Sequence, residues 1–199
     1  MTAMAIDALR NRLEAVVIGA SAGGIDALLK LLPALPADAG VAVFVVLHLP
    51  RDRRSLLVEI FAPKCAVPVV EPADKEPVVP GTVYFAPPDY HLLIDSGPRI
   101  ALSVDEPVNY SRPSIDVLFE SAADVYQERL MGIVLTGGNH DGAAGLATVQ
   151  LAGGVSVVQE PGSAHSAWMP TAALQRVDAD FVLPLEGIAV LLRGLRGRG

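Results

Sequence analysis

The sequence predicts an α/β fold: a doubly wound, mostly parallel sheet with an inserted antiparallel β-hairpin. Short apolar, β-branched runs alternate with segments of helical periodicity along nearly the whole chain. The run 41–47 is apolar without interruption, which is typical of a strand buried on both faces of a parallel sheet. Between residues 82 and 104 the rhythm changes, and two short runs flank Ser96-Gly97-Pro98, which indicates the hairpin.

The first half of the chain contributes strands and helices in alternation. Strands are expected at 15–18, 41–47 and 67–70, and a helix at 55–61. The helix between the first two strands is predicted by an apolar stripe of Ile25, Leu28, Leu29, Leu32 and Leu35. The runs 82–86, 91–95 and 99–104 follow, and the last two form the predicted hairpin.

The strongest helical pattern follows Pro113, with Ser114 as its expected N-cap. Further strands are expected at 131–135, 155–158 and 181–183, and further helices at 143–152, 170–175 and 185–195. No repeat or linker interrupts this pattern. We therefore expect one domain over residues 15–199, preceded by an N-terminal extension of residues 1–14.

Composition excludes several classes of protein. The 199 residues are 51% hydrophobic and 19% charged with a net charge of −7, a balance that suits one globular domain and argues against a nucleic-acid binder. The single Cys65 excludes an internal disulfide and favours a reducing compartment. The start has no apolar signal region and no run is long enough to cross a bilayer, so we expect a cytoplasmic protein without membrane insertion.

In a sheet of this kind, ligands and catalysis lie beyond the carboxyl ends of the parallel strands. After the first strand, Gly19-Ala20-Ser21-Ala22-Gly23-Gly24 fits the G-x-S-x-G pattern, in which small neighbours expose a nucleophilic serine on a tight turn. The free N–H groups of a following helix would suit a developing oxyanion. A phosphate-binding loop and a plain glycine turn are the alternatives.

A serine nucleophile needs a base and a carboxylate that orients the base. His48 follows the second strand, and Asp141 lies in the loop after the strand 131–135. The alternatives are a structural histidine and an N-cap for the helix starting near residue 143. The order Ser, His, Asp and the early serine disfavour an ordinary α/β-hydrolase.

The sequence also disfavours two other enzyme classes. Gly138-Asn139-His140-Asp141 and Asp89-Tyr90-His91 resemble fragments of metallophosphoesterases, but the sequence offers too few further ligands for two metal ions. A nucleotide-binding oxidoreductase would carry an acidic residue at the end of the second strand, where this chain has His48.

The chain resembles the catalytic domain of the CheB-type chemotaxis protein-glutamate methylesterases. The matching stretches run collinearly over residues 15–195: Val16-Val17-Ile18-Gly19-Ala20-Ser21-Ala22-Gly23-Gly24, Leu47-His48-Leu49-Pro50, Tyr84-Phe85-Ala86-Pro87-Pro88, Pro113-Ser114-Ile115-Asp116-Val117-Leu118-Phe119, Leu135-Thr136-Gly137, Asp141-Gly142-Ala143 and Met169-Pro170. Agreement over this length is far more specific than any single motif.

The resemblance implies a serine hydrolase that removes γ-glutamyl methyl esters from the signalling helices of methyl-accepting chemotaxis receptors, with deamidation of receptor glutamines in some members. It assigns Ser21 as nucleophile, His48 as base and Asp141 as its orienter. The backbone N–H groups of Ala22 and of the Gly138 region would form the oxyanion hole. No metal or organic cofactor is implied.

The chain departs from the family pattern at three places. Ala22 replaces a usual threonine, Gly138 replaces a methionine that would shape the oxyanion hole, and the usual receiver domain is absent, so we expect no phosphorylation control within this chain. The altered loop at Gly138 motivates an alternative, a catalytically weak binding or scaffolding module. Arg51, Arg53 and Arg54 are candidates for docking acidic receptor helices. No residue pattern specifies an oligomeric state.

Overall fold

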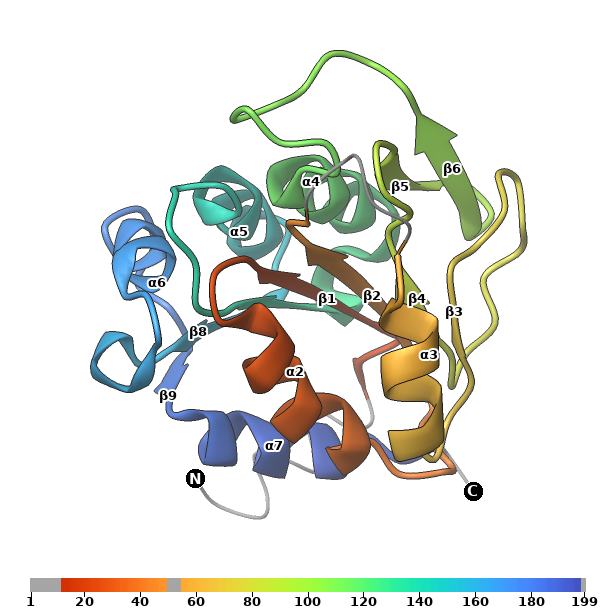
Figure 1. The fold of residues 1–199 in the computed structure, drawn as a ribbon, viewed down its shortest axis with the longest axis horizontal. Coiled ribbons are helices and arrows are strands. Elements are labelled where there is room, and N and C mark those ends of the chain that lie inside the picture. Colours follow the sequence, from red (N-terminus) through yellow and green to blue (C-terminus); the bar gives the residue numbers. More distant parts are fainter. Residues whose placement is uncertain (1–11, 50–54, 198–199) are drawn as a thin grey trace.

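The computed structural model describes residues 12–49 and 55–197. Its centre is a seven-stranded sheet in the order β3-β4-β2-β1-β7-β8-β9, and every pair of neighbouring strands is parallel (Figure 1). The strands are β1 (Ala15–Ala20), β2 (Ala42–Leu47), β3 (Val69–Val70), β4 (Val83–Phe85), β7 (Leu130–Val134), β8 (Val155–Gln159) and β9 (Phe181–Leu183). The predicted α/β class is confirmed, with the stretch 82–86 inside the parallel sheet as β4.

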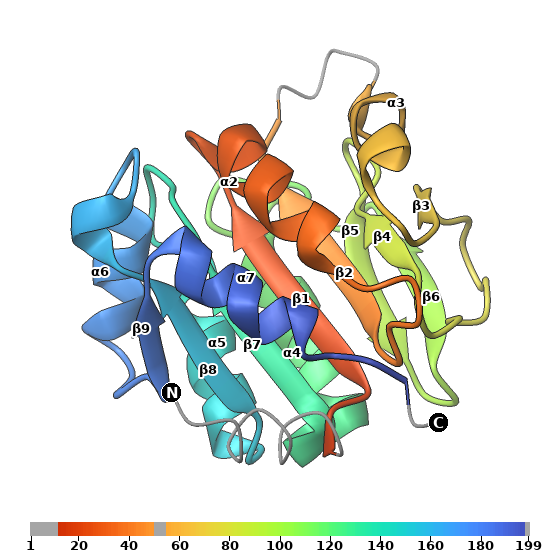
Figure 2. The ribbon, with the colours of Figure 1, turned by 90° about the horizontal axis from the view of Figure 1, so that it is seen from below.

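Helices cover both faces of the sheet (Figure 2). One face carries α2 (Gly24–Leu31), α3 (Leu57–Phe61) and α7 (Leu185–Arg193), and the other carries α4 (Ile115–Tyr126), α5 (Ala143–Leu151) and α6 (Trp168–Leu174). Four single 3₁₀ turns lie at Leu32–Ala34, Ala62–Lys64, Gln127–Arg129 and Pro161–Ser163.

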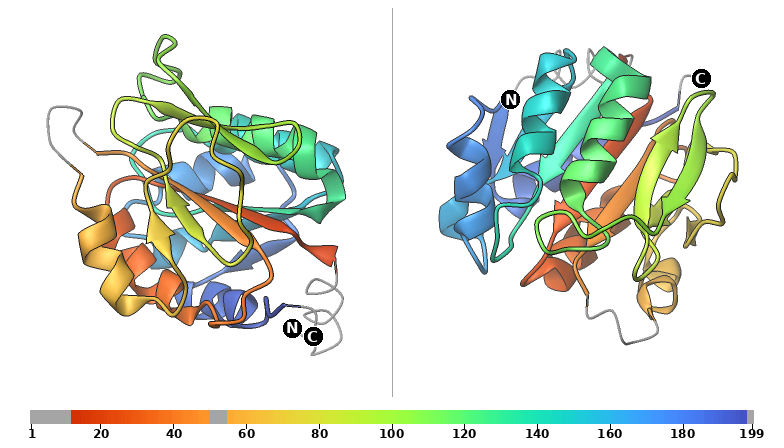
Figure 3. Two further views of the ribbon diagram at one scale, coloured as in Figure 1. Left: turned by 90° about the vertical axis from the view of Figure 1, so that its right-hand side faces the viewer. Right: turned by 90° about the horizontal axis from the view of Figure 1, so that it is seen from above.

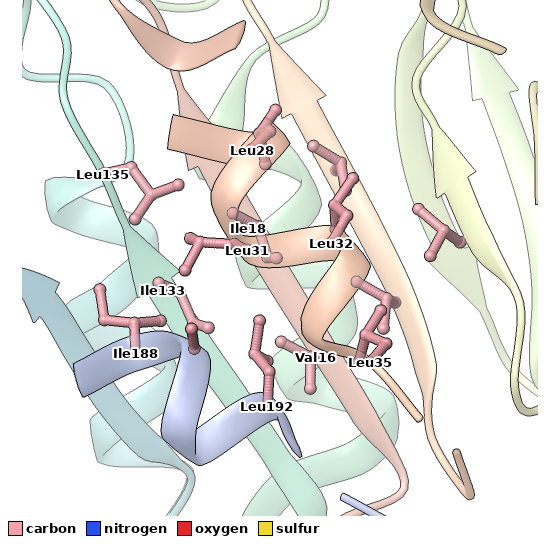
Figure 4. Packing of buried hydrophobic residues seen from close by; sticks show 14 of the residues in the cluster. Val16, Ile18, Leu28, Leu31, Leu32, Leu35, Ile133, Leu135, Ile188 and Leu192 are labelled. Carbon is pink, nitrogen blue, oxygen red and sulfur yellow. The ribbon is translucent and has the colours of Figure 1, made fainter. Parts of the chain in front are cut away.

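The central strand β1 shows why unbroken apolar runs form this sheet. All six of its residues are buried. Val16 and Ile18 point into the core under α2 and α7 (Figure 4). Val17 belongs to the core on the opposite face, with residues of α4 and α5. Because successive side chains of a strand point to opposite faces, a strand covered on both sides must be apolar at every position.

The predicted hairpin is present as a separate two-stranded antiparallel sheet, β5 (His91–Asp95) and β6 (Arg99–Ser103). It packs against α4 on the outer side of the domain (Figure 3). The Ile94 N–H donates a hydrogen bond of 3.1 Å to Ser121 Oγ on that helix. The hairpin thereby supports α4, whose N-terminus enters the candidate site.

The expected stripe on the first helix is wrong in one respect. Ile25 is 38% exposed, and the buried face is formed by Gly24, Ala27, Leu28 and Leu31. The small residues let the helix approach the sheet closely, since a Cβ at Gly24 would lie 2.5 Å from Leu47 Cδ1. The contact face therefore turns toward the small residues and leaves Ile25 at its margin.

Some sequence-based expectations lie outside the described residues. They include most of the extension 1–14 and the arginines Arg51, Arg53 and Arg54. Within residues 12–49 and 55–197, no helix has the length and apolar character needed to span a membrane.

Candidate active site

Three neighbouring strands bring the predicted site residues to one edge of the sheet. Ala20 of β1 is in register with Leu47 of β2, so Ser21 and His48 are the next residues on adjacent strands. The His48 N–H donates to the Ala20 carbonyl at 3.1 Å. On the other side, the Ser21 N–H donates to the Thr136 carbonyl at 3.0 Å, which places the loop after β7 beside the serine.

The serine lies on a tight turn that only a glycine at its third position allows. The Ser21 carbonyl accepts the Gly24 N–H at 2.8 Å, and Gly23 has a φ of 78°, in the left-handed region. A Cβ at Gly23 would also lie 2.5 Å from His165 Cβ. Within residues 12–49 and 55–197, Ser21 Oγ has no hydrogen-bond partner, and its side chain is partly exposed.

The predicted histidine and carboxylate meet across 93 residues of sequence. His48 Nε2 lies 2.9 Å from Asp141 Oδ2. The Asp141 side chain is completely buried, whereas 13% of the His48 side chain is exposed. A neutral imidazole that donates from Nε2 to the carboxylate has its free lone pair on Nδ1. The second ring nitrogen is thus left to act as a base.

Asp141 receives four further hydrogen bonds. Their donors are Asn109 Nδ2 at 2.8 Å, Ser114 Oγ at 2.9 Å, the Ile115 N–H at 2.7 Å and the Asp116 N–H at 3.1 Å. Burial by itself would raise the pKa of Asp141, but the bonds from His48, Asn109 and Ile115 outweigh it and lower the pKa. The carboxylate that faces His48 is therefore ionised at neutral pH.

Two aspartates cap each other's helices. Asp141, which precedes α5, accepts the first two N–H groups of α4 (Ile115 and Asp116). Asp116 Oδ1 in turn accepts the Gly142 N–H at 2.9 Å and the Gly145 N–H at 2.6 Å at the start of α5. The exchange fixes the N-termini of both helices at the site.

This exchange bears on two sequence-based expectations, of which the N-cap position of Ser114 is confirmed. Ser114 occupies the N-cap position of α4, but its hydroxyl donates to Asp141 and makes no capping bond. The alternative role for Asp141, an N-cap of the helix that follows it, is wrong because Asp116 fills that role. Tertiary contact between α4 and α5 decides both outcomes, since each carboxylate reaches the neighbouring helix.

The backbone beside the serine offers free donors. Among the described residues, the N–H groups of Ala22 and Gly138 donate no hydrogen bond. Thr136 Oγ1 donates to the Ala22 carbonyl at 2.8 Å and accepts the Ser166 N–H at 2.9 Å, which ties the serine turn to two loops. These bonds hold the backbone on both sides of Ser21.

Gly137 and Gly138 meet different surroundings. A Cβ at Gly137 would overlap the thioether of Met169 and lie 3.0 Å from Ser21 Cβ, so a larger residue here would displace Met169 and crowd the serine. A Cβ at Gly138 would meet no atom within 4 Å. Space is therefore open at the position where the family pattern has a methionine.

Two hollows adjoin this loop at His140. The first, of about 450 Å³, is lined by His140, Ala167, Trp168, Thr171, Ala172 and Gln175. The second, of about 590 Å³, extends from His140 to Asn109, Asp116 and Arg176. Trp168 is 67% exposed at the start of α6 and offers an aromatic surface beside the site.

One of the two metallophosphoesterase-like fragments, Asp89-Tyr90-His91, has a structural role here. Asp89 forms a salt bridge with Arg112 at 2.7 Å. His91 is buried, and its ring accepts the Ser114 N–H at 3.2 Å while its other nitrogen lies 3.2 Å from the Glu106 carbonyl. Within the two described ranges, no three His, Cys, Asp or Glu side chains are grouped so as to hold a metal ion.

Asn109, Asp116 and Thr136 belong to the site but were not predicted from the sequence. Asp116 lies in the family-like stretch Pro113-Ser114-Ile115-Asp116, and Thr136 directly follows the apolar run 131–135. Asn109 carried no such signal, because it lies in an irregular loop with neither apolar periodicity nor a motif.

Comparisons with known proteins agree with this geometry. The family model described as CheB methylesterase matches residues 16–192. A Leptospira interrogans protein, provisionally named a protein-glutamate methylesterase/protein-glutamine glutaminase, is 46% identical over 178 residues, which cover 89% of this chain and 92% of the relative. A Symbiobacterium thermophilum protein-glutamate methylesterase/protein-glutamine glutaminase is 39% identical over 97% of this chain, which spans 53% of that longer relative.

Solved structures give the same result. The crystal structure of the Thermotoga maritima CheB methylesterase catalytic domain matches with a TM-score of 0.84 and 30% sequence identity, covering 90% of this chain and 98% of that domain. Family model, relatives and fold agree over nearly the whole chain, and the recognition made from the sequence is confirmed. This chain belongs to the CheB methylesterase family.

Proposed function

We propose that this chain hydrolyses γ-methyl esters of glutamate on the signalling helices of methyl-accepting chemotaxis receptors, with Ser21, His48 and Asp141 as its catalytic triad. The observation that carries the proposal is the 2.9 Å contact between the buried, ionised Asp141 and Nε2 of His48, which follows the strand next to that of Ser21. Family membership supplies the substrate class.

In the first half-reaction, His48 Nδ1 takes the Ser21 proton as Oγ attacks the ester carbonyl. The tetrahedral intermediate collapses when His48 returns that proton to the methoxide, which leaves as methanol. Water then attacks the acyl-serine by the same route and releases the glutamate carboxylate. The sum is ester plus water to carboxylate, methanol and one proton.

The oxyanion of both intermediates is assigned to the backbone N–H groups of Ala22 and Gly138. Both are free donors beside Ser21, and a backbone donor is independent of the side chains at these two positions. The departures from the family pattern at Ala22 and Gly138 therefore do not remove the two backbone donors of the proposed oxyanion hole.

The same centre suits a glutamine side chain, with ammonia leaving in place of methanol. The names of the relatives include a protein-glutamine glutaminase activity. We assign this second reaction to the same triad and place the protein in the cytoplasm, where the signalling helices of such receptors lie.

The test measures methanol release from a methylated receptor signalling fragment. Ser21→Ala is expected to lower the rate by about three to six powers of ten, the scale of triad removal. The matched control is Ser96→Ala, an exposed serine in the hairpin turn far from the site, which should retain full activity.

Equal release by Ser21→Ala and the intact chain would refute the triad assignment. Absence of release from the intact chain, together with no reaction of Ser21 with a serine-directed phosphonate, would favour a binding or scaffolding module. Labelling without methanol release would keep the triad and reject the receptor ester as substrate.

A further inference from the structure

We propose that Asn109 is a positioning residue of this site: its single amide bridges Asp141 to Asp116 and holds the carboxylate that orients His48. The inference rests on the proposed function, because it concerns how the triad is kept in its working geometry. Asn109 itself touches neither the serine nor the histidine by any recorded hydrogen bond.

The contact is made by one nitrogen with two hydrogens. Asn109 Nδ2 lies 2.8 Å from Asp141 Oδ1 and 2.7 Å from Asp116 Oδ2. Asp141 is completely buried and Asp116 is 5% exposed. One amide hydrogen for each carboxylate satisfies both bonds.

Such a bridge is needed because two buried carboxylates repel each other. Burial raises the pKa of Asp116, and the charge of Asp141 raises it further. The backbone N–H groups that bond Asp141 come from the start of α4, and those that bond Asp116 come from the start of α5. Asn109, in contrast, donates to both aspartates. A neutral amide suits this place, since a lysine or arginine here would compete with His48 for Asp141.

The loop is shaped to deliver this side chain. Asn109 has a φ of 50° and Tyr110 a φ of 61°, in the left-handed region that asparagine tolerates better than most residues. Val108 and Ser111 exchange backbone hydrogen bonds of 3.1 and 2.9 Å across the turn. Arg112 anchors its far end to Asp89 and to the Val104 and Asp105 carbonyls.

The charged groups around Asp141 define what a variant changes. His48 faces it from the end of β2, Asp116 and Glu120 from α4, and His140 and Arg176 line the adjoining hollow. Asn109→Ala removes the bridge without adding charge, so Asp141 is no longer tied to Asp116 and its hydrogen bond to His48 weakens. Asn109→Asp keeps the shape of the side chain but replaces the donor by a third acid.

The experiment uses two readouts that need no receptor substrate. The first is the rate of Ser21 labelling by a serine-directed phosphonate, and the second is the NMR signal of the His48 Nε2 proton, which lies in the bond to Asp141. Asn109→Ala should label about tenfold to hundredfold more slowly, with the signal of the His48 Nε2 proton moved toward that of an imidazole without this hydrogen bond. Asn109→Asp should be slowed at least as much, although it preserves the shape.

The control is Val108→Ala, a neighbouring exposed position in the same loop, which should match the intact chain in both readouts. Melting temperatures are measured for every variant, and rates are compared well below them. Full labelling by Asn109→Asp, or an unchanged signal of the His48 Nε2 proton in Asn109→Ala, would reduce Asn109 to a structural part of the loop and overturn the proposal.

The two proposals fail separately. If the intact chain is labelled but releases no methanol, the receptor ester is rejected while the labelling rates still decide the role of Asn109. If the intact chain is neither labelled nor active, the proposed function falls, and the signal of the His48 Nε2 proton alone decides whether Asn109 acts on the His48–Asp141 pair.

Discussion

Replacing Asp141 tests whether one side chain both orients His48 and holds the N-terminus of α4. In Asp141→Ala, five donors lose their acceptor: His48 Nε2, Asn109 Nδ2, Ser114 Oγ and the N–H groups of Ile115 and Asp116. Burial of the site prevents water from replacing the carboxylate freely. We therefore expect a loss of stability together with the loss of activity.

The magnitude follows from the number and burial of these donors. Removing one partner of a buried, hydrogen-bonded charge network costs about 3–5 kcal/mol. Relief of the repulsion between Asp141 and Asp116 acts in the opposite direction, so we expect about 3–4 kcal/mol. For a domain of this size that corresponds to a fall in Tm of roughly 6–16 °C.

Two variants separate the contributions. Ser114→Ala removes one of the five donors and should cost about 1 kcal/mol in the free energy of unfolding. His48→Ala removes a donor at the partly exposed edge of the network and should abolish activity with a stability loss below about 1 kcal/mol. Urea denaturation followed by circular dichroism measures all three. An Asp141→Ala variant no less stable than Ser114→Ala would refute the assigned structural role.

Two further predictions concern the same centre. The pKa of Asp141 is lowered on folding, so its contribution to stability is complete above the unfolded pKa of about 4 and is lost as pH falls through the folded value. The stability advantage of the intact chain over Asp141→Asn should therefore be smaller at pH 2.5 than at pH 6. An advantage that stays constant over this range would contradict the prediction. Gly137→Ala should slow phosphonate labelling of Ser21 by about tenfold or more, because the new methyl group overlaps Met169 and presses on Ser21 Cβ. The double variant with Met169→Ala should recover part of that rate, and no recovery would place the strain elsewhere.

Local signals in the sequence were sufficient for the sheet and for the triad candidates. The unbroken apolar run of β2 indicates a strand that is buried on both faces of a parallel sheet. The small-residue turn around Ser21 indicates an exposed side chain at a strand end, and the phosphate-binding loop and the plain turn were its alternatives. The strand-end rule then selected Ser21, His48 and Asp141 together. Collinear motifs added the reaction class, which no single loop could supply.

Side-chain orientation on a helix was less predictable. The apolar stripe placed Ile25 in the core, but close approach at Gly24 and Ala27 turned the helix so that Ile25 is exposed. Helical spacing predicts an apolar stripe along the helix that is wider than the face in contact with the sheet. The surface of the sheet then decides which edge of that stripe is buried.

The sequence by itself determined the fold class and the order of the elements, and it supplied the candidate residues Ser21, His48 and Asp141, because these depend on periodicity and on glycine conformations that are local. Only the tertiary structure decided the exchange of caps between Asp116 and Asp141 and the bridge from Asn109. Those bonds join residues up to 32 positions apart, and their donors become neighbours only when α4 and α5 pack side by side. A buried carboxylate takes whichever donors the packing brings to it, and no local pattern names them.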